Sequence, residues 1–584
     1  MDRPVKTTRY LGSYSLDIKL PVDGLKFRSN LGLDARTVQD YEFWSAKTSN
    51  RGMGTSYAKN AVDKYTMFTL ENMLFYDKTF NDKHTLGVTL LQSIQEDKRE
   101  SVNVAMENLP ADNLKYYDLG SGLVTNTIGS SMIKWNMASF MGRINYNYLG
   151  RYLLTVSARY DGSSRLADGH KWVLFPSAAL AWRINEESFM SSTSGWLDNL
   201  KLRLGFGKTG NSAVDPYQTK GTLSLIRYPF DNGGTPTIGY APNAMANSLL
   251  TWETTDQWNL GIDFGVLRGR INGTIDLYMQ NTHDLLLKRQ LPVVSGFPDV
   301  LSNVGKTRNK GIEVSINSMN INSKDFQWTT DLMLSSNKEE IVELYNGKND
   351  DIGSKWFIGQ PVNVHYDYRK VGIWQNTESD LAEMAKFAAN GTEFAPGDIK
   401  IQDVNGDYKI TDADKQILGN PRPKLIASMV NTFNYKGFDL SVFLYASFGA
   451  MLYNDIYALE HCGRNGGVKV DYWTPNNPTN AYPRPSIDEE RPIYITSTYY
   501  EKADFLRVKT MTLGYTLPKT LTNKFLVEKL RVYFTAQNPF IFTNYTGIDP
   551  EAAKVNSAGN PETNGSGFGT PSVSSWIFGI NLTL

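Results

Sequence analysis

The chain of 584 residues has few residues that could form disulfides or bind zinc. It contains one cysteine, Cys462, which excludes a disulfide framework and a zinc site built from cysteines. Its histidines stand singly at positions 84, 170, 283, 365 and 461, and no pair has the spacing of a helical zinc motif. The sequence therefore argues against both a disulfide-stapled fold and a zinc enzyme.

The chain also lacks an excess of charge of either sign and a long hydrophobic run. Lys plus Arg and Asp plus Glu both number 60, whereas a nucleic-acid-binding protein would carry a basic excess. No stretch reaches the roughly 18 uninterrupted apolar residues of a membrane-spanning helix. The longest candidate runs from Trp172 to Trp182 and contains Pro176. Residues 1–10 have no apolar core of a secretory leader, so we expect no signal peptide.

Apolar and polar residues alternate with a period of two along much of the chain. In residues 152–160 the even positions are apolar, whereas Thr155, Ser157 and Arg159 are polar. Successive side chains of a β-strand point to opposite faces, so each such segment has one apolar and one polar face. The clearest segments are 14–20, 25–33, 152–160, 258–264, 271–279, 427–444 and 576–584.

The connections between these strands alternate between short and long. The short ones are 21–24, 81–83, 149–151, 185–199, 267–270, 436–437 and 518–528. The long ones are 35–64, 94–137, 208–255, 281–311, 336–424, 448–504 and 539–574. About 17 strands of about ten residues, with turns at one end and long loops at the other, are typical of an outer-membrane barrel. We therefore predict an all-β fold, an antiparallel transmembrane β-barrel with long extracellular loops.

The two strand faces and the strand parity refine this prediction. Tyr, Trp and Phe lie near the ends of the apolar faces, as in an aromatic girdle, and the polar faces suit a wet lumen. A soluble sandwich would have shorter strands and would bury its apolar faces against a second sheet. With long loops outside, the strands at 11–20 and 575–584 both run inward. Because such barrels have an even strand number, this odd count predicts that opening strands are missing from the chain, and a strand overlooked in the sequence is the alternative.

Several segments resemble the SusC/RagA-type TonB-linked outer-membrane transporters of Bacteroidetes. These are YLLTVSARYDGSSRLADGHKWVLFPSAALAWRINE at 152–186, LKLRLGFGKTGN at 200–211, LSNVGKTRNKGIEVSI at 301–316, YWTPNNPTNAYPRP at 472–485, ADFLRVKTMTLGYTLP at 503–518 and NPFIFTNYTGIDPE at 538–551. The matches follow the family's order and cover nearly the whole chain.

This resemblance implies most of the 22-stranded barrel of such a transporter in the cell outer membrane, over residues 1–584 and incomplete at the N-terminus. It implies that the plug, the TonB box and about five opening strands are absent. The partners it implies are a SusD-like lipoprotein, TonB, outer-membrane lipid and a glycan or peptide ligand. A barrel of this kind performs no covalent chemistry, so we expect no enzymatic activity.

The long connection 336–424 contains a calcium-loop-like turn, DVNGDYKITDAD, at 403–414. Asp403, Asn405, Asp407, the Lys409 carbonyl and Asp414 take the first, third, fifth, seventh and last ligand positions of such a loop. The pattern departs in two places, because Tyr408 stands where Gly is favoured and Asp414 replaces the longer Glu. Similar motifs recur here in the family, so we predict a structural Ca²⁺. The alternative is a solvated turn rich in Asp and Asn.

Two further features have simpler explanations than catalysis or specific contacts. The pattern G-x-G-x-x-G at 205–210 ends a predicted strand and lacks the helix that a dinucleotide site requires. Aromatic residues in the long loops could stack on sugars or grip a peptide, but could equally pack the loops, and we assign no substrate contacts. They are Trp356, Trp374, Tyr453, Tyr457, Tyr472, Trp473, Tyr482, Tyr499 and Tyr500.

Two other functions fit parts of the sequence. A secreted or surface β-rich carbohydrate-binding or adhesin protein would share the aromatic loops and the calcium-like turn. A β-rich hydrolase would need a convergent acid pair or a catalytic triad, which the sequence does not indicate.

Overall fold

The computed structural model describes residues 1–52, 54–230, 237–454, 469–486, 491–522, 524, 527–551 and 572–583. Three residues discussed above, Tyr457, His461 and Cys462, lie outside the described residues. Seventeen strands belong to one large sheet. The chain divides into two compact units, the first of residues 1–186, 203–259 and 280–306, and the second of residues 187–202, 260–279 and 307–584.

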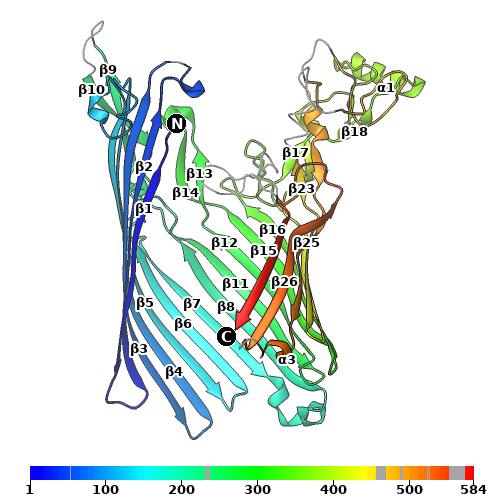
Figure 1. The fold of residues 1–584 in the computed structure, drawn as a ribbon. Coiled ribbons are helices and arrows are strands. Elements are labelled where there is room, and N and C mark those ends of the chain that lie inside the picture. The colour runs from blue at the N-terminus through cyan, green and yellow to red at the C-terminus, as the bar shows by residue number, and fades with distance from the viewer. Residues whose placement is uncertain are drawn as a thin grey trace. The chain divides into compact units, whose positions relative to one another are not determined.

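The first unit contains a meander in which each strand pairs antiparallel with the next (Figure 1). Its strands are β1 Val5–Lys19, β2 Leu25–Trp44, β3 Tyr57–Phe80, β4 His84–Glu107, β5 Val124–Tyr148, β6 Tyr152–Ser163 and β7 Trp172–Arg183. Further along the chain lie β8 Leu197–Asn211, β9 Thr222–Tyr228, β10 Thr237–Ala244, β11 Glu253–Val266, β12 Ile271–His283, β13 Leu286–Gln290, β14 Asp299–Asn303 and β15 Lys306–Asn322.

The second unit contains a similar antiparallel meander. Its strands are β16 Phe326–Glu343, β21 Leu425–Tyr435, β22 Phe438–Phe448, β25 Phe505–Thr516, β26 Lys529–Thr543 and β27 Ser575–Thr583. Its long connections hold β17 His365–Asp367, β18 Lys370–Ile373, α1 Glu378–Ala389, β19 Ile399–Ile401, β20 Gln416–Gly419, β23 Met451–Tyr453 and β24 Tyr500–Lys502, and α3 is Lys519–Thr522.

Short 3-10 helices lie in the connections of both units. They are η1 Ser49–Arg51, η2 Leu119–Ser121, η3 Ile184–Glu186, η4 Ser188–Thr193, η5 Gln218–Lys220, η6 Val293–Ser295, η7 Asp412–Asp414 and η8 Ile495–Thr498. Among the described residues, none of the helices combines the length and the apolar character needed to cross a membrane.

The structure confirms the predicted tight turns and the strand count, but the predicted strand length is wrong. Asn81 and Asp82 both have φ of 51°, the left-handed conformation of the two central residues of a turn in which the Lys83 amide donates to the Phe80 carbonyl at 3.1 Å. By contrast, β2, β3, β4 and β5 have 20, 24, 24 and 25 residues. Their loop-side halves are joined across strands by ion pairs such as Lys59–Asp40, at 2.7 Å. Charged residues stand at consecutive positions there, as Asp97 and Lys98 do on β4, so the alternation ends before the strand does.

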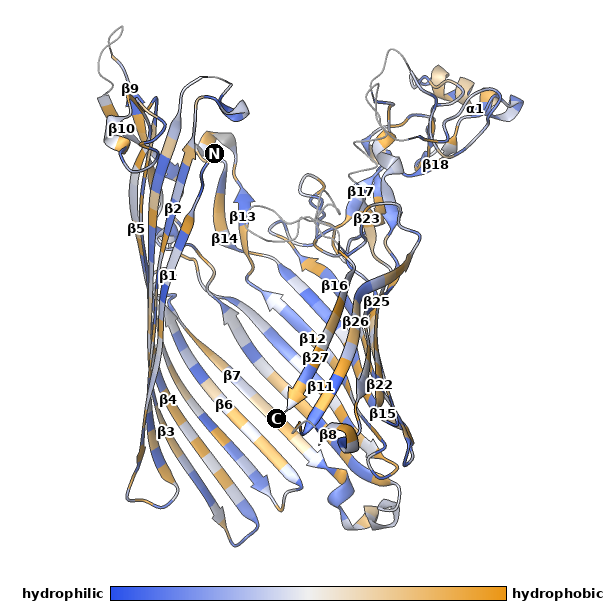
Figure 2. Ribbon diagram, in the orientation of Figure 1, coloured by the Kyte–Doolittle hydropathy of each residue, from blue (hydrophilic) through white to orange (hydrophobic). Residues whose placement is uncertain are grey.

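Apolar side chains of the first meander are exposed on one face of the sheet. Leu90, Ile144 and Val156 are 51%, 49% and 44% exposed, so no second layer of protein covers them. The other face is polar, and Thr155 there donates a hydrogen bond to Asn145, at 3.0 Å. Figure 2 shows the resulting alternation of hydrophobic and hydrophilic residues along β3, β4, β6 and β7. An exposed apolar face beside a polar one indicates lipid on one side and water on the other.

Two rows of aromatic side chains bound this apolar face. The turn-side row is His84, Tyr148, Tyr152 and Trp182, with neighbouring ring centres 4.9, 6.3 and 6.5 Å apart. The loop-side row is Phe140, Tyr160 and Trp172, with Trp172 lying 4.9 Å from Tyr160 and 6.3 Å from Phe140. From Phe140 to Tyr148, β5 rises roughly 27 Å at about 3.4 Å per residue. At the usual strand tilt this gives an apolar band about 20 Å tall, close to the band of about 25 Å in outer-membrane barrels.

The apolar face can be tested with a charge at Ile144, which lies between the two aromatic rows. We expect Ile144→Arg to destabilise the folded protein in lipid vesicles by about 2–4 kcal/mol, because a guanidinium there replaces hydrocarbon contact. The matched control is Asn145→Arg, since the neighbouring Asn145 side chain points to the polar face. Urea unfolding in vesicles measures the difference, and equal stabilities of the two variants would contradict the assignment of the faces.

Candidate functional site

Two long connections of the second unit pack together into a loop module with a core of its own. The module comprises residues 344–424, 469–486 and 491–503, and Figure 1 shows α1 and β18 within it. The predicted excursion at 336–424 therefore begins later, because β16 continues to Glu343. One cluster of buried residues joins the two connections through Ile373, Ile399, Ile401, Trp473, Tyr482, Ile495 and Tyr499. A second cluster contains Trp374, Met384 and Phe387.

Burial separates the aromatic loop residues singled out in the sequence into two groups. Trp374, Trp473, Tyr482 and Tyr499 are at most 7% exposed, so they pack the module together. Trp356, Tyr453, Tyr472 and Tyr500 are only partly buried or exposed. Half of these eight aromatic residues thus stabilise the loops and are not available to a ligand.

Helix α1 is fastened to β19 by Lys400. The helix begins at an N-cap, where the Thr377 hydroxyl accepts a hydrogen bond from the Asp380 amide. The Lys400 ammonium contacts Asp380 at 3.1 Å and Glu383 at 2.5 Å, and it lies 4.0 Å above the Trp374 ring. Burial by itself lowers the pKa of Lys400, but the hydrogen bonds with the two carboxylates raise it above its ordinary value. The lysine therefore stays charged and holds the helix on the module.

Gly397 lies where the two connections of the module meet. Its φ is 92°, in the left-handed region, and its carbonyl accepts a hydrogen bond from the Arg484 amide at 2.8 Å. A Cβ at this position would come within 2.5 Å of the Trp473 ring and 2.7 Å of the Arg484 Cβ. Both the backbone conformation and the close approach therefore require glycine.

A cavity of about 540 Å³ opens beside this junction. Its wall combines the aromatic rings of Phe394 and Tyr494 with Asp398 and Arg484, whose Nε and Oδ1 atoms are 2.9 Å apart. Aromatic surface next to a few fixed polar groups can bind a sugar or a peptide segment. This cavity is therefore a candidate site for a small polar ligand.

The calcium-like turn has much of the backbone of a cation-binding loop. Gly406 and Tyr408 have φ of 74° and 56°, so Tyr408 adopts the turn that glycine usually makes. The ring of Tyr408 lies 5.5 Å from that of Phe387, a contact that offsets the strain of this conformation. The Asp403 carboxylate accepts hydrogen bonds from the amides of Gly406, at 2.7 Å, and Tyr408, at 2.8 Å.

The side chains of this turn do not converge on one point. Asp414 is 0% exposed, and its carboxylate accepts hydrogen bonds from the Val404 and Thr411 amides at 2.9 and 2.8 Å. Asn405 and Asp407 bond to each other at 3.0 Å. In the described part of the chain, no three His, Cys, Asp or Glu side chains form a group that could hold a metal ion. The backbone therefore fits calcium better than the present side-chain positions do, and the calcium site stays a prediction.

Two titratable groups of the module, the partly buried Tyr368 and the buried His365, have shifted pKa values. The Tyr368 hydroxyl contacts Asp412 at 3.2 Å, and burial together with this carboxylate raises the pKa of Tyr368 to about 12. His365 is 4% exposed and lies 2.8 Å from the Met451 carbonyl, and burial lowers its pKa. Tyr368 therefore remains a hydroxyl and His365 remains neutral at physiological pH.

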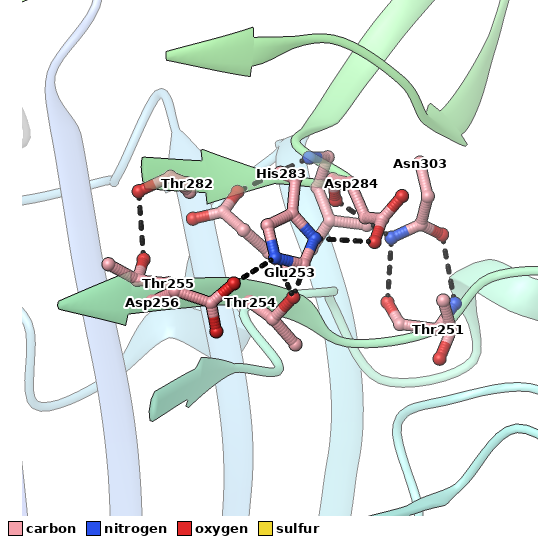
Figure 3. A network of polar contacts seen from close by, with 10 residues as sticks. Thr251, Glu253, Thr254, Thr255, Asp256, Thr282, His283, Asp284 and Asn303 are labelled. Carbon is pink, nitrogen blue, oxygen red and sulfur yellow. Dashed lines mark hydrogen bonds and ion pairs between the residues drawn. The ribbon is translucent and has the colours of Figure 1, made fainter. Parts of the chain in front are cut away.

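The first unit contains a polar network that the sequence did not reveal (Figure 3). His283 ends β12, and its two ring nitrogens lie 3.0 Å from Asp256 and 3.0 Å from Asp284. Its Nδ1 is also 2.9 Å from the Thr254 hydroxyl on β11. Asn303 on β14 continues the network by donating to the carbonyls of Thr251 and Asp284. The histidine joins residues from separate strands, so no local sequence pattern could have identified the site.

The glycine pattern at 205–210 is part of strand β8, as predicted. A Cβ on Gly210 would come within 2.1 Å of the Phe175 ring. The glycine therefore allows close packing and does not cradle a phosphate.

Comparison with known proteins decides the family. The family described as "TonB dependent receptor-like, beta-barrel" matches residues 2–539. This chain belongs to that family. TonB-dependent receptor P3 of Formosa agariphila is 32% identical over 581 residues, which cover 96% of this chain and 56% of that receptor. TonB-dependent receptor SusC of Bacteroides thetaiotaomicron is 35% identical over 434 residues, which cover 71% of this chain and 41% of SusC.

A solved structure has the same fold. The structure named "Structure of the RagAB peptide transporter" superimposes with a TM-score of 0.83 at 22% identity, over 99% of this chain and 62% of that chain. The predicted SusC/RagA type, the antiparallel barrel fold class and the outer-membrane location are thereby confirmed. The chain spans about half the length of the curated relatives it matches.

The junction at Gly397 can be tested with two alanine variants. Gly391 has a similar φ of 88°, but a Cβ there would meet nothing within 4 Å. Both alanines bear the left-handed strain, and only Gly397→Ala also collides with Trp473 and Arg484. We expect Gly397→Ala to cost about 1–3 kcal/mol more than Gly391→Ala.

Hydrogen exchange of residues 469–486 measures this difference, because loosening of the junction exposes their amides. Equal protection in the two variants would show that the two connections do not depend on this contact.

Proposed function

We propose that this chain is the barrel part of a SusC-like outer-membrane importer, working with a SusD-like lipoprotein and driven through TonB. The observation that supports this most directly is the apolar band of the first unit, exposed between two aromatic rows. A surface that is apolar on one face and hydrogen-bonded on the other suits a wall between lipid and a wet lumen. A secreted adhesin would have to cover the same residues with protein or leave them in water.

The substrate we propose is a glycan or oligosaccharide, with a peptide as the second possibility. The cavity beside Gly397 supports this class, because its rings and its Asp398–Arg484 pair match the faces and polar groups of such ligands. A neighbouring structure is named a peptide transporter and another relative is SusC, so the names of relatives do not separate the two classes. Neither class requires covalent chemistry from the barrel.

The loop module is the surface that we assign to the SusD-like partner. It has a buried core of its own, so it can present a fixed surface beyond the strands. Its exposed residues include Ile352, Val371 and Leu381, at 61%, 54% and 45%. Exposed apolar residues on a rigid element are typical of a protein interface.

Membrane fractionation followed by a binding assay tests this function. We expect the protein only in detergent-solubilised outer membrane, and we expect a purified SusD-like lipoprotein from the same gene neighbourhood to bind it. Arg484→Ala, which removes one polar wall of the cavity, should weaken oligosaccharide binding at least about tenfold. Recovery from the soluble fraction without detergent would overturn the proposal.

We also propose that the turn at 403–414 binds a structural Ca²⁺. Carboxylate oxygens that accept one amide hydrogen bond retain a lone pair for a cation, and the backbone already has the loop form. We expect chelation of Ca²⁺ to speed proteolysis of this loop in the wild type. We expect the Asp403→Ala variant to be cleaved rapidly whether or not the chelator is present. Asp350→Ala, in the same module but outside the turn, is the control. Cleavage that does not respond to the chelator in the wild type would contradict the site.

A further inference from the structure

On the polar face of the first unit, a tyrosine stands between two arginines well beyond the apolar band. Arg36 on β2, Tyr65 on β3 and Arg99 on β4 lie directly opposite one another in neighbouring ladders, and Ile133 on β5 continues this row. The guanidinium carbons of Arg36 and Arg99 are 4.3 and 4.9 Å from the centre of the Tyr65 ring. A guanidinium that stacks on a ring keeps its N–H donors at its edge, where they can bind an anion.

The row faces the polar side of the sheet and lies outside the membrane. Ile133 and Asn145 are an even number of residues apart on β5, so their side chains share one face. Ile133 is seven residues beyond Phe140 of the loop-side aromatic row, which is roughly 24 Å along the strand. At the usual strand tilt, the row lies about 17 Å beyond the apolar band. Its arginines therefore meet water on the face that lines the ligand path in the proposed function.

Arg36 differs from the neighbouring arginines in having no carboxylate of its own. Arg9 binds both oxygens of Asp34, at 2.8 and 2.6 Å, and Arg99 contacts Asp63 at 3.2 Å. Arg36 also favours the charged form of Asp34, but within the described ranges it forms no ion pair. Its side chain is exposed, so its donors are accessible to a ligand.

A second aromatic ring on the same face carries another arginine. The guanidinium carbon of Arg165 is 3.9 Å from the ring centre of Trp135 on β5, and this ring is partly exposed. Asp97 and Asp215 act on Arg165 electrostatically, so this arginine adds no excess charge to the face. From the strand spacing and the rise per residue, the backbones of Tyr65 and Trp135 are roughly 12 Å apart. This separation requires a ligand longer than one sugar ring.

We propose that this face binds an acidic oligosaccharide, with Arg36 as the counter-charge of a carboxylate and the Trp135 ring as a stacking surface for a neighbouring sugar. Guanidinium binds a carboxylate through two parallel N–H bonds, and the Tyr65 ring holds the Arg36 group in place for this contact. Sugar rings pack against aromatic faces. The proposal rests on the proposed function and narrows its substrate to glycans that carry carboxylates.

The test compares two probes that differ in charge alone. They are tetragalacturonate and its methyl ester, offered to the purified full chain in detergent. We expect the wild type to bind the acidic probe at least about tenfold more tightly than the ester, because charge-assisted hydrogen bonds are stronger than neutral ones. The Arg36→Gln variant should lose this difference and bind the acidic probe at least about tenfold more weakly than the wild type.

The matched control is Arg143→Gln. Arg143 is exposed on the same face of β5, ten residues from Ile133, and forms no ion pair within the part of the chain that the structure describes. This variant should bind both probes like the wild type. Equal affinity of the wild type and Arg36→Gln for the acidic probe would overturn the proposal, and so would an equal loss in Arg143→Gln. Tighter binding of an acidic peptide of the same charge would overturn the assignment to a glycan.

Membrane insertion separates the failure of this proposal from the failure of the proposed function. Heat-modifiable migration on gels shows whether Arg36→Gln forms the same folded barrel as the wild type. An inserted chain that binds the two probes equally, or binds neither, refutes the acidic site alone. A chain that never enters the membrane refutes the proposed function and the acidic site together.

Discussion

The contact between one exposed apolar sheet face and lipid hydrocarbon is the constraint on which the rest of the structure depends. Side chains such as Leu90 and Ile144 are about half exposed although they are strongly apolar. In water this surface would be a large aggregation-prone patch, whereas in a bilayer it needs no protein cover. The aromatic rows then set its limits, because rings of Tyr and Trp prefer the interface between hydrocarbon and water.

The antiparallel ladder follows from the same constraint. A bilayer offers no water to unpaired amides, so each strand must bond to its neighbours along the whole apolar band. Outside the apolar band, water can bond to unpaired backbone amides, so the chain is free to leave the sheet and form loops. The loop module builds its own core from Trp374, Trp473 and Tyr499.

The predictions from sequence succeeded where a local pattern reports directly on structure. Turns at 81–83 and 436–437 were found at their predicted positions, because such hairpins depend on residues adjacent in the chain. Strand ends were placed too early, since alternation disappears where charged residues stand at consecutive positions, as Asp97 and Lys98 do on β4. The ligand order of the calcium-like turn was readable, but the left-handed Tyr408 was not, because its support comes from Phe387 on α1. The His283 network and the Gly397 junction were missed because their partners are distant in sequence.

The sequence by itself determined the class of the fold, the number of strands, the positions of the tight turns and the likeness to the transporter family. All of these depend on periodicity or on residues close together in the chain. Only the tertiary structure decided which aromatic residues are buried in the loop module, where a cavity forms beside Gly397, and which carboxylates contact His283. These features depend on contacts between segments as far apart as Gly397 and Arg484, and such contacts leave no periodic signal in the sequence.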